Sequence, residues 1–191
     1  MKKIFLVLIL FFGSINILNA EVNRIISGNK EAKITIIAYE SLTCSHCADF
    51  HKDIYPQLKK DYIDTGLAKI EFRHFPLDVA AFNASKISQC KIGKGLEILN
   101  SLYSNQQEWV KGNTVEEIND NLKKFIKNQG YEVNFEKCIN DKKIEDYVLN
   151  DRIEGTKKFK VNATPTIIIN DEKFEKTLNY KNLKKSLEKL I

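Results

Sequence analysis

Runs of β-branched residues near the two ends of the chain predict the strands of a sheet. Residues 33–39 predict one buried strand, and residues 68–74 predict a second. Residues 166–169 form another such run, and a turn at residues 170–171 leads into a short return strand. We therefore expect two groups of strands separated by a long middle segment.

Between the first two strands, apolar positions recur with the period of a helix. They are Cys47, Phe50, His51, Ile54, Tyr55 and Leu58. Pro56 lies inside this stretch, so we expect it to kink the helix or to end its first half. A strand, a helix and a strand in this order predict a right-handed βαβ unit with parallel strands.

The middle of the chain predicts helices instead of strands. Asp78 and Thr114 can each cap a helix there, and Asn179 can cap a last amphipathic helix near the C-terminus. The pattern predicts an α/β fold of the order βαβ…ββα, in which one sheet is split by an inserted α-helical domain. The expected boundaries are 21–77 for the first part of the sheet domain, 78–160 for the helical insertion and 161–191 for the second part.

The start of the chain predicts export. Lys2 and Lys3 precede an apolar run that ends at Leu18, and Ala20 follows as a small residue at the expected cleavage position. The run is shorter than the roughly 20 residues that span a bilayer comfortably. We expect residues 1–20 to be a signal peptide, with an uncleaved membrane anchor as the alternative. The rest of the chain is exported in either case.

Composition and charge narrow the class of protein. The 191 residues are 43% hydrophobic and 29% charged, as expected of a globular protein. The net charge of +5 falls to +3 when Lys2 and Lys3 leave with the leader. Basic residues alternate with acidic ones along the predicted helices, and no basic stripe with interleaved aromatics occurs. We therefore expect no nucleic-acid partner.

All four cysteines lie in the part that would be exported, where an even number favours disulfides. Cys44 falls where a strand ends and a helix begins, so free N–H groups and the helix dipole stabilise its thiolate. His46, in the same turn, can add a donor or a positive charge. Cys47 is one turn further on and more shielded, and would resolve the mixed disulfide that Cys44 forms. The Cys44-Ser45-His46-Cys47 tetrapeptide therefore predicts a thiol–disulfide redox centre.

Two other uses of this cysteine pair are less favoured. A zinc site with His46 and His51 would need ligands from a second knuckle, and the two remaining cysteines are isolated. A purely structural Cys44–Cys47 bridge would close a small loop and add little stability. We expect no metal and no other cofactor. We expect His51 to be a packing or surface residue and His74 to face solvent in a loop.

Thr164-Pro165 stands directly before the strand at residues 166–169, remote in sequence from the tetrapeptide. A proline at such a place suggests a tight turn packed against the disulfide, and its peptide bond can be cis or trans. On its own this signal is weak. It gains weight from the segments around it.

Three segments together resemble the DsbA-like branch of the thioredoxin superfamily. They are residues 39–48 around the tetrapeptide, residues 72–78 with the sequence Phe-Arg-His-Phe-Pro-Leu-Asp, and Ala163-Thr164-Pro165-Thr166. The likeness is greatest to bacterial members with a CxHC centre and a Thr before the cis-proline. It covers essentially the whole chain after the leader.

The resemblance implies a thioredoxin fold with a helical insertion and dithiol oxidation of exported proteins in the periplasm. It also implies reoxidation by a quinone-linked membrane partner. By the same resemblance, Pro165 would be the cis-proline, and Thr164 would offer its backbone to an extended substrate segment and contact the sulfurs. Ser45 and Glu40 complete the expected supporting residues.

One position departs from the pattern of this branch. Members commonly carry a buried acid six residues before the first cysteine, where it helps to move the proton of the second cysteine. Here that position is Ala38, and the acid is Glu40. Strand alternation puts both positions on one face. Glu40 could therefore do part of this work, with a solvated strand-end glutamate as the equal alternative.

Cys90 and Cys138 lie in two different helices of the predicted insertion. The loop between them would hold 49 residues, and closing it would contribute roughly 4 kcal/mol in the chain-entropy model. We expect a structural disulfide that holds the helical block together. Two buried free thiols and a second, regulatory redox pair remain the alternatives.

The sequence thus favours a monomeric periplasmic oxidoreductase that donates its Cys44–Cys47 disulfide to unfolded or reduced exported proteins. A disulfide isomerase or reductase on the same fold remains an alternative. A non-catalytic chaperone or binding module that uses only the peptide groove is another.

Overall fold

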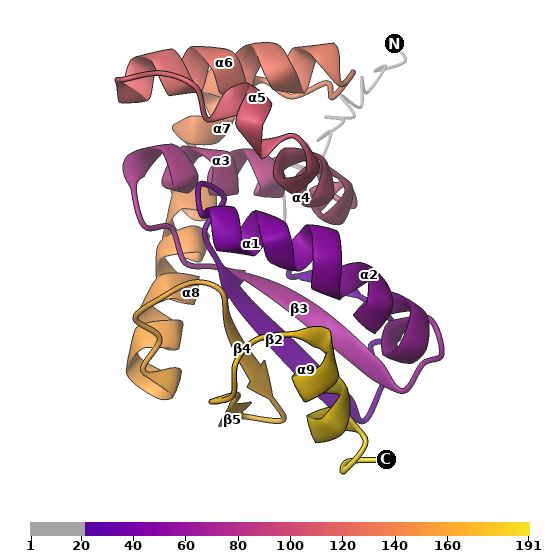
Figure 1. Ribbon diagram of the computed structural model, residues 1–191. Coiled ribbons are helices and arrows are strands. Elements are labelled where there is room, and N and C mark those ends of the chain that lie inside the picture. Colours follow the sequence, from indigo (N-terminus) through magenta and orange to yellow (C-terminus); the bar gives the residue numbers. More distant parts are fainter. Residues whose placement is uncertain (1–21) are drawn as a thin grey trace, which may run out of the picture.

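The computed structural model describes residues 22–191, so the predicted signal peptide at residues 1–20 lies outside the described residues. A five-stranded sheet has the order β1-β3-β2-β4-β5. Helices flank the sheet, and a block of further helices lies at one end of it (Figure 1). Within residues 22–191, no helix combines the length and the apolar character needed to cross a bilayer. The predicted α/β class with inserted helices is confirmed.

The central strand of the sheet is β2, Ile34–Glu40. It pairs in parallel with β3, Ala68–His74, as the βαβ pattern predicts. On its other side it pairs antiparallel with β4, Thr166–Ile169, which leads into β5, Glu172–Lys173. The sheet therefore joins segments more than a hundred residues apart. The edge strand β1, Ile25–Ser27, pairs antiparallel with β3 and has no counterpart among the expected strands.

Alternation along β2 divides the interior into two layers. Ile36 and Ala38 belong to a large core with residues of the helices that follow β2 and of α9, Tyr180–Leu187. Ile37 and Tyr39 point to the opposite face and pack with residues from the end of α8, Lys142–Phe159. At Gly155 of α8 an added Cβ would lie 2.7 Å from the Tyr39 ring, so α8 approaches the sheet closely.

One long helical segment connects β2 to β3. It consists of α1 (Ser45–Asp49), the π-helical turn η1 (Phe50–Ile54), α2 (Tyr55–Leu58) and a second π-helical turn η2 (Lys59–Ile63). Pro56 stands in the first turn of α2 and lacks the N–H that would continue an α-helical pattern. Pro56 therefore interrupts the α-helical hydrogen bonding, as expected, and the interruption takes the form of the wider π turn η1. The segment stays helical after Pro56.

The middle of the chain forms the predicted helical block. Its helices are α3 (Val79–Gln89), α4 (Gly95–Ser104), α5 (Gln106–Trp109), α6 (Val115–Asn128) and α7 (Phe135–Ile139). Trp109 and Leu122 belong to the same core as Ile36, so the block and the sheet share one interior. The last helix of the middle segment, α8, leaves the block and returns along the sheet (Figure 1). The proposed domain boundaries stay a prediction.

Candidate functional site

The two cysteines of the tetrapeptide lie where β2 gives way to helix. Cys44 is the N-cap of α1, and the N–H groups of Cys47 and Ala48 both donate to its carbonyl oxygen. Its Sγ is half-buried and donates to the Thr164 carbonyl oxygen at 3.4 Å. Cys47 is fully buried, and both cysteines are free thiols. The helix start therefore presents one cysteine and shields the other.

The surroundings of Cys44 favour its thiolate. The Cys47 thiol, the Thr164 side chain and the backbone N–H groups of His46 and Cys47 can all donate to the sulfur, with Cys47 contributing most. Together they outweigh burial and lower the pKa of Cys44 to about 5. The buried Thr164 hydroxyl has no other hydrogen-bond partner within residues 22–191, so it is free to turn toward the sulfur.

Cys47 has the opposite tendency. Burial is the main cause that raises its pKa far above the ordinary value, and donation to Cys44 together with the negative charge of Glu40 raises it further. Two thiols three residues apart thus have pKa values that are shifted in opposite directions. Such a pair ionises at the half-buried sulfur of Cys44 and keeps its proton at the fully buried sulfur of Cys47.

Glu40 is buried, which rules out the solvated strand-end alternative. Its side chain is 2% exposed, and its Oε2 lies 2.9 Å from Nε2 of His51. Burial raises the pKa of Glu40, and the neighbouring His51 opposes that rise. His51 is itself buried and stacks on Tyr103 with 4.1 Å between ring centroids. His51 therefore packs in the interior, as one of the two expectations had it, and it also contacts the Glu40 carboxylate, which was not expected.

The remaining expected residues surround the sulfurs at different depths. Thr164-Pro165 forms a cis peptide bond and lies against Cys44. Ser45 and His46 are exposed, and the His46 ring lies 3.7 Å from Asp49. His46 therefore acts on Cys44 through its backbone N–H, whereas its ring faces solvent. Within residues 22–191 no group of three or more His, Cys, Asp or Glu side chains could hold a metal ion.

Two supports of the active-site loop come from the helical block. Gln106 of α5 is 5% exposed and donates to the carbonyl oxygens of Leu42 and Cys44, at 2.8 and 3.0 Å. Asp78, the N-cap of α3, accepts from the Thr43 hydroxyl at 2.6 Å. Neither contact could be predicted from sequence spacing. The sequence predicted Asp78 only as a helix cap. The insertion therefore fixes the backbone that carries Cys44.

The expectation of a solvent-facing loop at His74 is wrong. His74 ends β3, is 2% exposed, and its Nε2 lies 2.8 Å from Nε2 of Gln89. Burial lowers the pKa of His74, so the ring is neutral near pH 7. The backbone N–H of His74 donates to the side chain of Asp151, because α8 covers this end of the strand.

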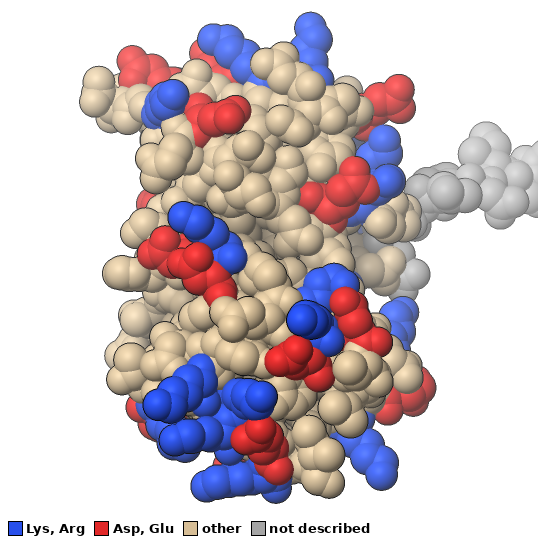
Figure 2. Space-filling view, turned by 45° about the vertical axis from the view of Figure 1, so that its right-hand side comes forward, with Lys and Arg blue, Asp and Glu red and all other residues tan. Residues whose placement is uncertain are grey.

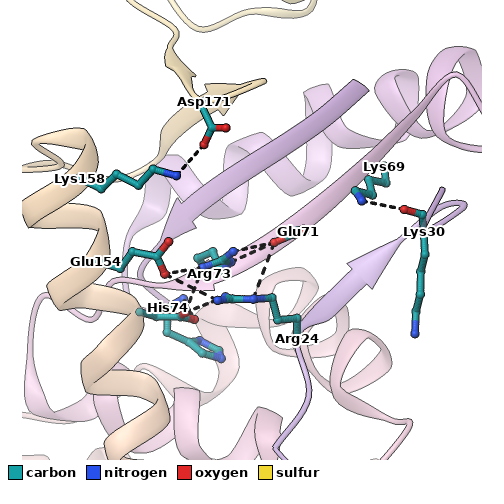
Figure 3. A network of polar contacts seen from close by, with 10 residues as sticks. Arg24, Lys30, Lys69, Glu71, Arg73, His74, Glu154, Lys158 and Asp171 are labelled. Carbon is teal, nitrogen blue, oxygen red and sulfur yellow. Dashed lines mark hydrogen bonds and ion pairs between the residues drawn. The ribbon is translucent and has the colours of Figure 1, made fainter. Parts of the chain in front are cut away.

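A charged network around Arg73 and Glu154 joins the sheet to α8 (Figure 3). Asp151 belongs to it through Arg73 and the His74 backbone N–H. Arg73 of β3 lies at its centre and donates to Glu71 at 2.7 Å and to Glu154 at 3.0 Å. Asp151 also accepts from Arg24, which precedes β1, at 3.1 Å. The network thus links β3 to α8 and to the segment that precedes β1.

Cys90 and Cys138 form a disulfide with 5.7 Å between their Cα atoms. Cys90 is the C-cap of α3, and Cys138 lies in α7. The bond therefore joins two helices of the block and contributes no atom to the Cys44 site. Its structural role stays a prediction.

The chain is similar to proteins of a known family. A thioredoxin family model matches residues 20–189. The crystal structure of alpha-DsbA1 from Wolbachia pipientis superposes with a TM-score of 0.77 and 30% identity, covering 91% of this chain and 93% of that one. Disulfide bond formation protein D of Bacillus subtilis is 26% identical over 172 residues, which cover 85% of this chain and 74% of that protein.

A Rickettsia prowazekii protein named as a protein-disulfide oxidoreductase is 28% identical over 175 residues. The match covers 88% of this chain and 62% of the Rickettsia protein. The chain thus spans less than two thirds of the length of that relative. The shared part is the part that carries both cysteines and the proline loop.

Proposed function

The chain belongs to the thioredoxin family, in its DsbA-like branch, and from this membership we propose that it is a thiol–disulfide oxidoreductase that introduces disulfides into exported proteins. The observation that carries the proposal is the contrast within the cysteine pair. Cys44 is accessible and has a pKa lowered to about 5, whereas Cys47 is buried and its pKa is raised. Attack requires an accessible sulfur, and the buried partner completes the exchange.

The reaction begins from the oxidised pair. A substrate thiolate attacks the Cys44 sulfur, the Cys44–Cys47 bond breaks, and the Cys47 sulfur leaves and takes up a proton. A second substrate thiolate then attacks the substrate sulfur of the mixed disulfide, and Cys44 leaves as a thiolate. The substrate loses two electrons and gains a disulfide, and the enzyme gains the two electrons. The low pKa of Cys44 makes it a good leaving group, which favours this direction.

The neighbouring residues take supporting roles in this proposal. Thr164 contacts the Cys44 sulfur, and Pro165 shapes the loop along which an extended substrate segment lies. His46 and Ser45 provide the first turn of the helix, and the backbone N–H of His46 stabilises the thiolate. Glu40, with His51, is the group that moves the proton on and off Cys47. Its burial and its electrostatic effect on Cys47 support that role.

The proposal extends to the cell compartment and to the partners. Residues 1–20 would direct export to the periplasm as a signal peptide, and a quinone-linked membrane partner would reoxidise the Cys44–Cys47 pair. The substrates would be unfolded or reduced exported proteins, and the enzyme would act as a monomer. In this view residues 21–77 and 161–191 form the redox domain, and residues 78–160 form the insertion that supports the active-site loop through Gln106.

The test is a thiol-oxidation assay with the oxidised protein and a reduced, unfolded substrate chain. We expect rapid loss of substrate thiols with the natural protein and none with Cys44→Ala. The double variant Cys90→Ala with Cys138→Ala, which lacks the other two cysteines, serves as the matched control and should retain the activity. A Cys44→Ala variant with full biological activity would instead support a chaperone or binding module.

The reduction potential of the pair decides the direction of electron flow. A glutathione redox series, read out by alkylation of Cys44, gives this potential. A value toward the ~−120 mV of strong oxidants supports donation of the disulfide, whereas a value near thioredoxin's ~−270 mV would favour a reductant.

A further inference from the structure

A groove beside the redox centre has one acidic wall. It holds about 310 Å³ and lies between the helical segment that begins at Cys44 and the loop that carries Pro165. His46 and Thr164 belong to its lining, and the Thr164 carbonyl oxygen lies 3.4 Å from the Cys44 sulfur. Phe50, Ile54 and Leu178 supply apolar lining. The acidic wall comes from Asp49 and Asp53.

The two carboxylates are not neutralised by basic side chains. Asp49 is 66% exposed, and its ion-pair partner within residues 22–191 is the exposed His46 ring at 3.7 Å. Within the same residues no cation lies at ion-pair distance from the Asp53 carboxylate, and no Lys or Arg lines the groove. Both aspartates therefore present negative charge to whatever occupies the groove.

This local charge is opposite in sign to that of the whole chain. The sequence carries a net charge of +5. Lys and Arg side chains are spread among Asp and Glu over the face drawn in Figure 2. Within residues 22–191 neither carboxylate of this wall pairs with a Lys or Arg, so the acidic wall is a specific feature of the groove and does not follow from the overall composition.

We propose that Asp49 and Asp53 make the enzyme prefer cysteines that have a Lys or Arg close by in the substrate sequence. This inference rests on the proposed function, because it concerns the substrates of the same site. A substrate segment whose cysteine is bonded to Cys44 continues past Thr164 and Pro165 into the groove. An extended chain advances about 3.3 Å per residue, so the residues that follow the cysteine lie along the groove that Asp49 and Asp53 line.

A basic neighbour favours the reaction in two ways. It pairs with the carboxylates while the apolar stem of its side chain lies on the groove lining. It also lowers the pKa of the substrate thiol, so a larger fraction is the attacking thiolate. An acidic neighbour has both effects reversed. The disulfide exchange itself is unchanged and needs no further reactant.

The test compares three synthetic peptides, each with two cysteines, that differ only in the residue after the first cysteine: Lys, Gln or Glu. The second-order rate of oxidation by the oxidised protein is measured by acid quench and mass spectrometry, with dithiothreitol as an uncharged dithiol. The variant is Asp49→Asn with Asp53→Asn. The matched control is Glu116→Gln with Asp120→Asn, which removes two exposed charges from α6.

At low salt we expect the Lys peptide to react about tenfold faster than the Glu peptide, since each surface charge pair contributes up to a few-fold. Added salt should reduce this ratio. The ratio should fall several-fold in the Asp49/Asp53 variant and stay at the natural value in the α6 control. Because each ratio is taken within one protein, the intrinsic reactivity of the peptides cancels between proteins.

An unchanged ratio in the Asp49/Asp53 variant would overturn the inference, and so would a ratio that is insensitive to salt in the natural protein. Either result leaves the proposed function intact if the peptides and dithiothreitol are still oxidised. If the natural protein oxidises neither the peptides nor dithiothreitol, the proposed function fails, and the preference for basic neighbours fails with it.

Discussion

At the scale of single residues, the two cysteines of the redox centre lie in environments with opposite effects on a thiol pKa. Cys44 and Cys47 carry the same side chain and are separated by one helical turn. Donors at the helix start lower the pKa of one, and burial together with Glu40 raises the pKa of the other. The pKa values of the two thiols therefore differ already in the protein without substrate, a difference that we call the polarisation of the pair.

This polarisation predicts a pH-dependent difference in stability between the reduced and the oxidised protein. Between about pH 5 and the ~8.5 of an unfolded cysteine, the unfolded reduced chain holds a proton that folded Cys44 has released. Stability of the reduced form should therefore rise with pH across this window, relative to the oxidised form. Above ~8.5 the trend should reverse, because folded Cys47 keeps a proton that the unfolded chain loses.

Urea unfolding of both forms at a series of pH values measures this difference. The Cys44→Ser variant provides the control, since it lacks the thiol whose pKa is lowered, and its stability should not rise relative to that of the oxidised natural protein between pH 5 and ~8.5. A difference between the two natural forms that is flat across the window would contradict the lowered pKa of Cys44.

Glu40 offers a second prediction at this scale. Its negative charge is one of the causes that raise the pKa of Cys47, so Glu40→Gln should lower that pKa while leaving the buried hydrogen bond to His51 possible. Carbon-13 NMR of labelled cysteine Cβ atoms follows each thiol separately during a pH titration. Glu97→Gln, which removes an exposed carboxylate from α4, is the control and should leave Cys47 unchanged. Equal Cys47 titrations in both variants would remove Glu40 from the proton path.

Residues whose role depends on local position were predictable from the sequence. Cys44 follows from the strand–helix junction, and the shared face of Ala38 and Glu40 follows from strand alternation. The contact of His51 with Glu40 and the contacts of Gln106 with the active-site loop could not be predicted from the sequence. The Glu40–His51 contact depends on the phase of a helix containing a π turn, and the Gln106 contacts span more than sixty residues. Local periodicity carries no information about such distances.

At the scale of elements, the Cys90–Cys138 disulfide connects the end of α3 to α7. Removing it with Cys90→Ala and Cys138→Ala should lower the free energy of unfolding by about 2–5 kcal/mol, since the unfolded chain regains the freedom of a long loop. Denaturant unfolding measures this loss. The Cys44–Cys47 potential should stay close to its natural value, because the bond shares no atom or hydrogen bond with Cys44. A large shift of that potential would indicate coupling between the two pairs.

Elements with a long periodic pattern were predictable, and the shortest ones were not. β2 and β3 lie close to their predicted places, because each repeats its pattern over several residues, and α6 begins directly after its predicted cap, Thr114. β1 has three residues and α5 has four, too few to establish a period. The helix α5, which was not predicted, bears on function because its Gln106 donates to the backbone of the active-site loop.

At the scale of the whole molecule, one sheet is assembled from both ends of the chain, and α8 returns from the helical block to cover it. The charged network around Arg73 fixes this return. Asp151 of α8 contacts the backbone of β3 through the His74 N–H, and it also pairs with Arg24 ahead of β1. A single carboxylate thus connects three segments that are far apart in sequence.

The last prediction concerns this carboxylate. Asp151 is 3% exposed, so Asp151→Ala leaves the His74 N–H without its acceptor and removes negative charge beside the buried Arg73. Breaking a buried pair in this way costs about 3 kcal/mol or more, which denaturant unfolding would register as a lower midpoint. Glu154→Gln is the control. That side chain is 37% exposed and binds the same arginine, so its loss should cost less than about 1 kcal/mol. Equally small losses in the two variants would mean that burial does not strengthen this network, and that α8 is held to the sheet by its apolar contacts with Tyr39 instead.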